Sequence, residues 1–230
     1  MDFRTLKGEV PYGRVITRCK IPKTIALTYD DGPSEYTDHL LDILHLATAR
    51  ATFFLSGNTN SKGEIDITAK WVKAIKRMDK DGHQIASHTW SHPDLDEIPS
   101  EARKDELSKN ERAIANILNK YPTYMRPPYL KCNQATGCLD DMKTQGYHVI
   151  GYTLDSTDWL RENDLDAMIK AVDDGFHNID PNEGNVLMIQ HDTIQKSAID
   201  LTKYILEKVK KMGWRGRTQF LHSFHGDTDC

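Results

Sequence analysis

Short apolar runs, often β-branched, recur along the chain, and most are followed by a longer segment whose apolar residues repeat at the helical period. The short runs predict strands at Thr24–Tyr29, Ala51–Leu55, Gln84–Ser87, Thr123–Arg126, His148–Leu154, Asn185–Gln190 and Thr218–Leu221. The longer segments predict helices at Asp38–Ala47, Ile67–Met78, Glu101–Asn119, Leu139–Gln145, Leu165–Val172 and Ser197–Met212. Glycine follows three of these helices, where a left-handed residue often ends a helix.

This alternation predicts an α/β fold: a distorted (β/α) barrel with about seven parallel strands, closed or nearly closed. The chain shows no internal repeat, low-complexity tract or linker, so we expect one domain over residues 1–230. In such barrels the catalytic residues gather at the carboxyl ends of the strands and in the loops just after them. Polar residues that follow different predicted strands are therefore expected to share one site.

The composition fits a globular protein, with 38% hydrophobic and 8% aromatic residues. No apolar run approaches the roughly 18 to 20 residues that a membrane-spanning helix needs. The formal net charge is −4, with mixed signs and no basic stripe, which argues against a nucleic acid as the main partner. We expect a monomer without a membrane span.

The four cysteines allow three pairings. Cys19 lies near one end and Cys230 is the last residue, and compact domains often bring their termini together. Cys132 and Cys138 lie in one loop-like stretch. We favour the pairs 19–230 and 132–138, which predict a secreted or cell-wall protein because disulfides persist in oxidising surroundings. Four reduced thiols in a cytosolic protein are the alternative, and no signal-peptide pattern is visible at the N-terminus.

The first polar cluster follows the predicted strand at Thr24–Tyr29 and contains Asp30 and Asp31, followed by Gly-Pro. One interpretation is a turn in which Asp31 caps a helix. The other is chemical: one carboxylate binds a metal and the other is left free as a base. Because side chains alternate along a strand, the two carboxylates can point to different places.

The second cluster contains His88 and His92, which can bind one metal from a single helical turn, although Pro93 disfavours helical geometry at His92. This spacing alone is weak evidence for a site. With Asp31 the two histidines would form a set that leaves positions open for water and substrate. Imidazole and carboxylate ligands suit zinc, and also cobalt, nickel or manganese.

Three further clusters follow later predicted strands. In the first, two prolines after Arg126 predict an extended backbone that fixes the N–H of Tyr129 as an oxyanion donor, although a rigid surface turn is equally compatible. In the second, Trp159 is either a platform for a sugar or acyl group or ordinary core. In the third, His191 ends an apolar run, a place where a single histidine is more often structural.

Taken in order, the five clusters closely resemble the five motifs of the polysaccharide deacetylases, the NodB-homology or family-four carbohydrate esterases. The matching segments are TYDDGP, HTWSH, RPPY, DSTDW and IQHD, between residues 28 and 192. The TYDDGP variant and the cysteines near the ends resemble the fungal-type chitin deacetylases. The resemblance implies a metal-dependent hydrolase that removes N-acetyl groups from N-acetylglucosamine residues of chitin or chitooligosaccharides and releases acetate.

The resemblance also implies roles for the residues of the first clusters. Asp31, His88 and His92 would bind a divalent metal, zinc before cobalt. Asp30 would be the general base that activates water, and Arg126 would hold its carboxylate.

For the later clusters it implies an acid and a binding pocket. His191 would protonate the leaving amine, with its pKa supported by Asp158. The Tyr129 N–H would meet the oxyanion, and Trp159 and Ile189 would enclose the acetyl methyl group.

Two residues depart from the family pattern: Leu130 replaces a common glycine, and Ile189 stands where leucine is usual. Both put the substrate preference in doubt rather than the activity. Acetylxylan or peptidoglycan deacetylation therefore remains open. An inactive polysaccharide-binding module would have lost a ligand, the base or the acid, and none is lost. A glycoside hydrolase would need two carboxylates, such as Asp30 and Asp158, about 5 to 9 Å apart.

Overall fold

The computed structural model describes residues 10–59 and 61–216, and these form one parallel sheet of nine strands. The strands are β1 (Val15–Ile16), β2 (Thr24–Asp30), β3 (Thr52–Leu55), β4 (Gln84–Ser87), β5 (Tyr124–Met125), β6 (His148–Ile150), β7 (Leu154–Asp155), β8 (Asn185–His191) and β9 (Arg215–Gly216). Their order is β1-β6-β5-β4-β3-β2-β8-β7, and β9 pairs with β2. Within the described residues β1 and β7 are the two edge strands of this order and do not pair with each other. The sheet is therefore an open, distorted barrel, as the sequence predicts.

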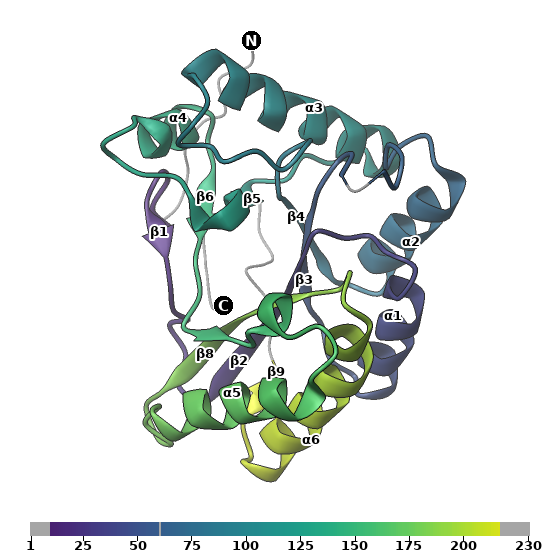
Figure 1. Ribbon diagram of the computed structural model, residues 1–230, viewed down its shortest axis with the longest axis vertical. Helices are drawn as coiled ribbons and strands as arrows, with labels where there is room; N and C mark the ends of the chain where they lie inside the picture. The colour runs from purple at the N-terminus through teal and green to yellow at the C-terminus, as the bar shows by residue number, and fades with distance from the viewer. Residues whose placement is uncertain (1–9, 60, 217–230) are drawn as a thin grey trace.

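The helices lie around the outside of the curled sheet (Figure 1). They are α1 (Thr37–Leu46), α2 (Ala69–Lys80), α3 (Ser100–Leu118), α4 (Cys138–Thr144), α5 (Leu165–His177) and α6 (Thr202–Lys211). Three short turns accompany them: η1 (Pro128–Leu130), η2 (Asp158–Leu160) and the π-helical η3 (Ser197–Leu201). No helix in the described ranges is both long and apolar enough to cross a membrane.

Strand β2 shows how the sheet separates its two faces. All seven of its residues are buried, as expected for a strand that is covered on both faces. Leu27 and Tyr29 join the large core between sheet and helices, where the Tyr29 hydroxyl lies 2.8 Å from that of Thr202. Ala26 packs on the inner face with Phe54. Because side chains alternate, Asp30 also belongs to the inner face.

One predicted strand is wrong: the run His148–Leu154 forms two separate strands. β6 pairs with β1 and β5, whereas β7 pairs with β8 at the other end of the strand order. Gly151 and Tyr152 lie between them outside any strand. There the Gly151 N–H donates to the carbonyl of Ile16 (2.8 Å), while Thr153 bonds to Leu187 on β8.

Several predicted boundaries also differ from the structure. Helix α5 continues to His177, beyond the predicted end at Val172, because Phe176 extends its buried face past a polar stretch. The last predicted helix begins with a π-helical turn. The two-residue strands β1 and β9 were not predicted. The predicted strand Thr218–Leu221 lies outside the described residues.

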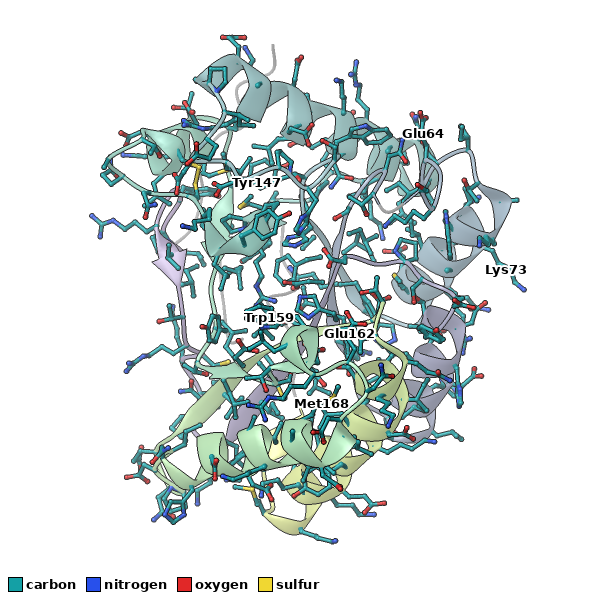
Figure 2. All side chains as sticks on the ribbon, viewed as in Figure 1. Glu64, Lys73, Tyr147, Trp159, Glu162 and Met168 are labelled. Atoms are coloured by element: carbon teal, nitrogen blue, oxygen red, sulfur yellow. A yellow bond between two sulfur atoms is a disulfide. The ribbon has the colours of Figure 1, made fainter. Side chains whose placement is uncertain are left out.

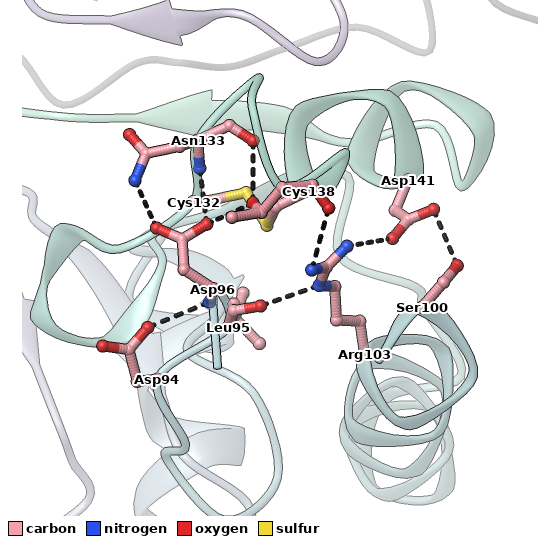
Figure 3. Close-up of a disulfide and its surroundings, with 10 residues drawn as sticks. Asp94, Leu95, Asp96, Ser100, Arg103, Cys132, Asn133, Cys138 and Asp141 are labelled. Carbon is pink, nitrogen blue, oxygen red and sulfur yellow. Dashed lines mark hydrogen bonds and ion pairs between the residues drawn. A yellow bond between two sulfur atoms is a disulfide. The ribbon is translucent and has the colours of Figure 1, made fainter. Parts of the chain in front are cut away.

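A disulfide joins Cys132 to Cys138, as predicted, with 5.1 Å between the Cα atoms. It ties the loop after η1 to the first turn of α4 (Figure 3). Arg103 of α3 supports the same loop by donating to the Thr136 carbonyl (3.1 Å) and to Asp141 (2.7 Å). The predicted Cys19–Cys230 pair stays a prediction, because Cys230 lies outside the described residues.

Candidate active site

The carboxyl end of β2 delivers two carboxylates to different neighbours. Asp30 is the last residue of the strand and is only 1% exposed. Asp31 follows it with φ +72°, a left-handed conformation that a non-glycine residue rarely adopts. This turn directs the Asp31 carboxylate towards His88 and His92. The chemical interpretation of the Asp-Asp pair therefore fits the geometry better than a helix cap, since α1 begins only at Thr37.

Asp31, His88 and His92 form a compact set of three ligand atoms. The two Nε2 atoms lie 3.2 Å apart, and the Asp31 Oδ1 atom lies 3.4 Å from His88 Nε2 and 3.2 Å from His92 Nε2. Among the described residues, this buried oxygen has no hydrogen-bond partner. Three ligand atoms this close together, one of them a buried oxygen without a hydrogen-bond partner, fit a divalent cation.

Electrostatics and hydrogen bonds keep this set ready to coordinate. His88 Nδ1 lies 2.7 Å from the carbonyl of Arg126, which can only accept, so the proton sits on Nδ1 and Nε2 keeps its lone pair. Burial, followed by His88, lowers the pKa of His92 to about 4, which leaves its imidazole neutral at pH 7. Burial raises the pKa of the Asp31 carboxyl, but the positive charges of His88 and His92, when protonated at acid pH, outweigh it and hold this pKa below its usual value.

The segment that holds the two histidines is a loop rather than the expected helical turn, because Thr89 and His92 have positive φ angles. Glu106 of α3 fixes this loop. Its carboxylate accepts from the Trp90 N–H (3.0 Å), the Ser91 N–H (2.7 Å) and the Ser91 hydroxyl (2.7 Å). The rigid loop therefore replaces helical spacing as the device that brings the two imidazoles together.

Asp30 is held by Arg126, and both side chains are buried. The Arg126 Nη1 atom lies 2.8 Å from Asp30 Oδ1 and also donates to Thr28. The other guanidinium nitrogens donate to backbone carbonyls, the shorter bond being 2.7 Å to Gly151, and the group stacks 4.4 Å from the Phe54 ring centroid. Burial lowers the pKa of Arg126 and Asp30 opposes this, so the guanidinium remains charged.

The second Asp30 oxygen faces the ligand set, since Oδ2 lies 4.0 Å from His88 Nε2. Asp30 is therefore fixed through one oxygen and leaves the other beside the three ligand atoms.

His191 and Asp158 form a second buried pair. His191 Nδ1 lies 2.8 Å from Asp158 Oδ1, and the His191 backbone N–H donates to Oδ2 at 2.8 Å. The Ser197 hydroxyl also donates to Oδ2. Burial lowers the pKa of His191, but the bond to Asp158 and its charge outweigh burial and raise this pKa to about 9. Burial raises the pKa of Asp158, but His191 holds it below its usual value.

Three predicted substrate residues lie around these groups. Tyr129 is 64% exposed, and its ring packs edge-on against His92 with 4.7 Å between centroids. Trp159 is 55% exposed, so it is not core, and Figure 2 shows it near the centre of the molecule's face. Ile189 is buried on β8 opposite Thr28, two residues before His191, and so belongs to the inner face.

The two prolines do not keep the whole RPPY segment extended. Pro127 is extended, but Pro128–Leu130 form the short turn η1, in which Tyr129 has φ +54° and Leu130 has φ +58°. The Tyr129 N–H is thus fixed by a left-handed turn rather than by an extended chain.

The sequence profile of the polysaccharide deacetylase family matches residues 17–150, which is more than half of the chain. The chain belongs to the polysaccharide deacetylase family. The predicted resemblance to this family is thereby confirmed. Membership favours the deacetylase interpretation over the glycoside hydrolase one.

Curated relatives of this polysaccharide deacetylase include fungal enzymes. A chitin deacetylase of Colletotrichum lindemuthianum is 36% identical over 92% of this chain and 84% of that protein. A chitin deacetylase of Pestalotiopsis sp is 37% identical over 90% of this chain and 66% of that protein. A probable peptidoglycan-N-acetylglucosamine deacetylase of Arthroderma benhamiae is 36% identical over 91% of this chain, but the chain spans only 46% of it.

The solved structure of the Colletotrichum lindemuthianum chitin deacetylase has a TM-score of 0.82 with this chain at 35% identity. The match covers 90% of this chain and 89% of that one. The sheet and helices of this polysaccharide deacetylase therefore follow those of a fungal relative over most of the described length.

Several residues that shape the site of this polysaccharide deacetylase were given no role on the basis of the sequence. Ser197 bonds the buried carboxylate of Asp158, and Glu106 fixes the histidine loop. Asp192 is fully buried, and its burial raises its pKa to about 6. In the sequence, the position of Asp192 directly after His191 was the one indication that it belongs to the site. The other two lie outside any motif and come close only through the fold.

Proposed function

We propose that this polysaccharide deacetylase hydrolyses the N-acetyl groups of N-acetylglucosamine residues in chitin or chitooligosaccharides. The observation that supports this most is the placement of two buried, separately held groups beside one set of ligand atoms. Asp30 is held by Arg126, and His191 is held by Asp158. The fungal chitin deacetylases that this chain resembles support chitin as the polymer.

Asp31, His88 and His92 would hold a divalent cation, with zinc proposed first and cobalt second. When bound, such a cation acts as a Lewis acid that polarises a carbonyl and makes water a better nucleophile near neutral pH. The described residues supply three protein ligands, which is the number that catalytic zinc sites use together with water or substrate.

Asp30 is proposed as the general base. Its Oδ2 atom faces the ligand set while Arg126 fixes Oδ1, so the free oxygen can accept a proton from the attacking water. Water then adds to the acetamide carbonyl carbon. The Tyr129 N–H would donate to the oxyanion that forms there, as a fixed dipole needing no reorganisation.

His191 is proposed as the general acid. With its pKa raised to about 9, the imidazole carries a proton at pH 7, and Nδ1 is bonded to Asp158. The Nε2–H is therefore the proton available for transfer. When the carbon–nitrogen bond breaks, this proton goes to the departing amine, which leaves a free amino group on the sugar and acetate as the second product. Trp159 and Ile189 would enclose the acetyl methyl group.

The enzyme is proposed to be secreted or located in the cell wall. There it would act as a monomer on a polysaccharide. The Cys132–Cys138 disulfide supports this, because such bonds persist in oxidising compartments. We also propose that zinc is the bound metal, that Cys19 and Cys230 form a second disulfide, and that residues 1–230 form a single domain.

A product map tests the substrate. The metal-loaded enzyme is incubated with N-acetylglucosamine oligomers, acetylated xylan and peptidoglycan fragments, and the products are analysed by mass spectrometry. We expect free acetate and a reduced acetyl content on the N-acetylglucosamine oligomers, with chain length unchanged. Reaction on peptidoglycan alone would favour the function named for the Arthroderma benhamiae relative. Reaction on xylan alone would contradict an N-deacetylase, and new reducing ends would indicate a glycosidase.

A further inference from the structure

The backbone of Asp31 needs an external restraint. Its φ of +72° is unfavourable for a residue with a side chain, yet this conformation directs the carboxylate to the two histidines. The next residue, Gly32, packs directly against Asp192, because a Cβ atom at Gly32 would lie 2.4 Å from both carboxylate oxygens. The turn therefore has little room, and something must hold it in this path.

Lys62 provides such a restraint from a loop between β3 and α2. Its Nζ atom donates to the carbonyl of Asp31 at 2.8 Å and to that of Gly32 at 2.7 Å. The Gly32 carbonyl also accepts from the Ser56 N–H at 3.3 Å. Two successive carbonyl groups can converge on one ammonium only if the chain keeps this local conformation, so the contact favours the left-handed turn.

Lys62 is itself anchored to the core. The indole N–H of Trp71, a buried residue of α2, donates to the Lys62 carbonyl at 2.9 Å. The Lys62 N–H bonds the carbonyl of Thr59 at 3.0 Å.

We propose that Lys62 is a positioning residue of the metal site, which holds the Asp31 backbone so that its carboxylate meets the imidazoles of His88 and His92. The inference rests on the proposed metal site. Charge alone would suggest the opposite effect, because the ammonium group of Lys62 repels a divalent cation bound nearby. Removing Lys62 thus has two opposite effects: loss of repulsion strengthens metal binding, whereas loss of the two hydrogen bonds weakens it. We infer that the second effect dominates.

The sign of the change in metal affinity tests the proposal. Lys62→Met removes the charge and both hydrogen bonds but keeps most of the side-chain length. Lys73→Met makes the same chemical change on the outer side of α2, where Figure 2 shows Lys73 pointing away from the sheet. The Zn²⁺ affinity of metal-free protein is measured by competition with a chromophoric chelator, and thermal unfolding of the same metal-free samples is recorded. We expect Lys62→Met to weaken Zn²⁺ binding about 10- to 100-fold, as loss of a group that orients a ligand does, and Lys73→Met to leave it unchanged.

Tighter or unchanged Zn²⁺ binding by folded Lys62→Met overturns the proposal, because charge or general stability would then be the role of Lys62. If Lys62→Met does not fold, Lys62→Gln is measured instead, because it removes the charge and its shorter side chain does not reach both carbonyls. Weakened Zn²⁺ binding then supports the proposal, and wild-type affinity overturns it. Failure of the wild-type protein to bind Zn²⁺ at all would instead refute the metal site itself.

Discussion

Asp30 and His191 are register partners on the neighbouring parallel strands β2 and β8. Their side chains therefore emerge side by side on the inner face, one held by Arg126 and the other by Asp158. This single pairing brings the proposed base and the proposed acid to the same edge of the sheet, although the two residues lie far apart in the chain.

The pair of His191 with Asp158 predicts a pH dependence. Since the pKa of His191 rises from its ordinary 6.5 to about 9, the stability that this pair contributes is complete below pH 6.5 and is lost as the pH rises through about 9. Asp158→Asn removes the charge that raises this pKa. We expect the alkaline limb of the kcat/KM profile to move to lower pH in the variant. An alkaline limb at the same pH in both proteins would show that it does not report His191.

The role of His191 as an acid predicts a difference between substrates. His191→Ala should lose more activity on an acetamide than on an activated aryl acetate, because a good leaving group hardly needs a proton. Steady-state kinetics on both substrates measures the contrast, with bound metal determined in the same samples. Equal losses would assign His191 to binding or oxyanion contact.

Because Asp30 is held by Arg126 and is not one of the three proposed ligands, a change at Asp30 should reduce activity without reducing metal binding. Asp30→Asn keeps Asp31, His88 and His92, so it should bind metal like the wild type yet lose about 10²-fold or more in rate. Metal content and kcat are measured together. Nearly full activity in the Asp30→Asn variant would exclude Asp30 as the base.

Arg126 can be tested through stability, because its guanidinium is fully buried with Asp30. Removing one partner of a buried ion pair costs about 3 to 5 kcal/mol. We expect Arg126→Met to lower the free energy of unfolding by an amount of that order in urea denaturation. Lys170→Met, in which the removed group forms an ion pair only with Asp174 among the described residues and both side chains are exposed, should change it by less than about 1 kcal/mol. Similar losses in both variants would contradict the buried pair.

Much of this architecture could be predicted from the sequence, because the buried strands carry apolar runs and the site residues directly follow them. The structure brings together the expected ligand set and both expected pairs on that basis. The split of His148–Leu154 was not predictable, since periodicity does not show that a chain crosses from β6 at one side to β7 at the other. Lys62 was also missed: it stands in a polar loop without a motif, and only the fold brings it to Asp31.

In the proposed mechanism, Asp31, His88 and His92 hold the cation on which deacetylation depends. The most direct test of this dependence is acetate release from N-acetylglucosamine oligomers by rigorously metal-free enzyme, before and after stoichiometric Zn²⁺ or Co²⁺ is added, with His92→Ala as a variant that lacks one of three ligands. We predict no release without metal, restoration by either cation in the wild type, and little restoration in the variant at the same concentration. Full activity of the metal-free wild type would show that deacetylation does not depend on a cation at this site.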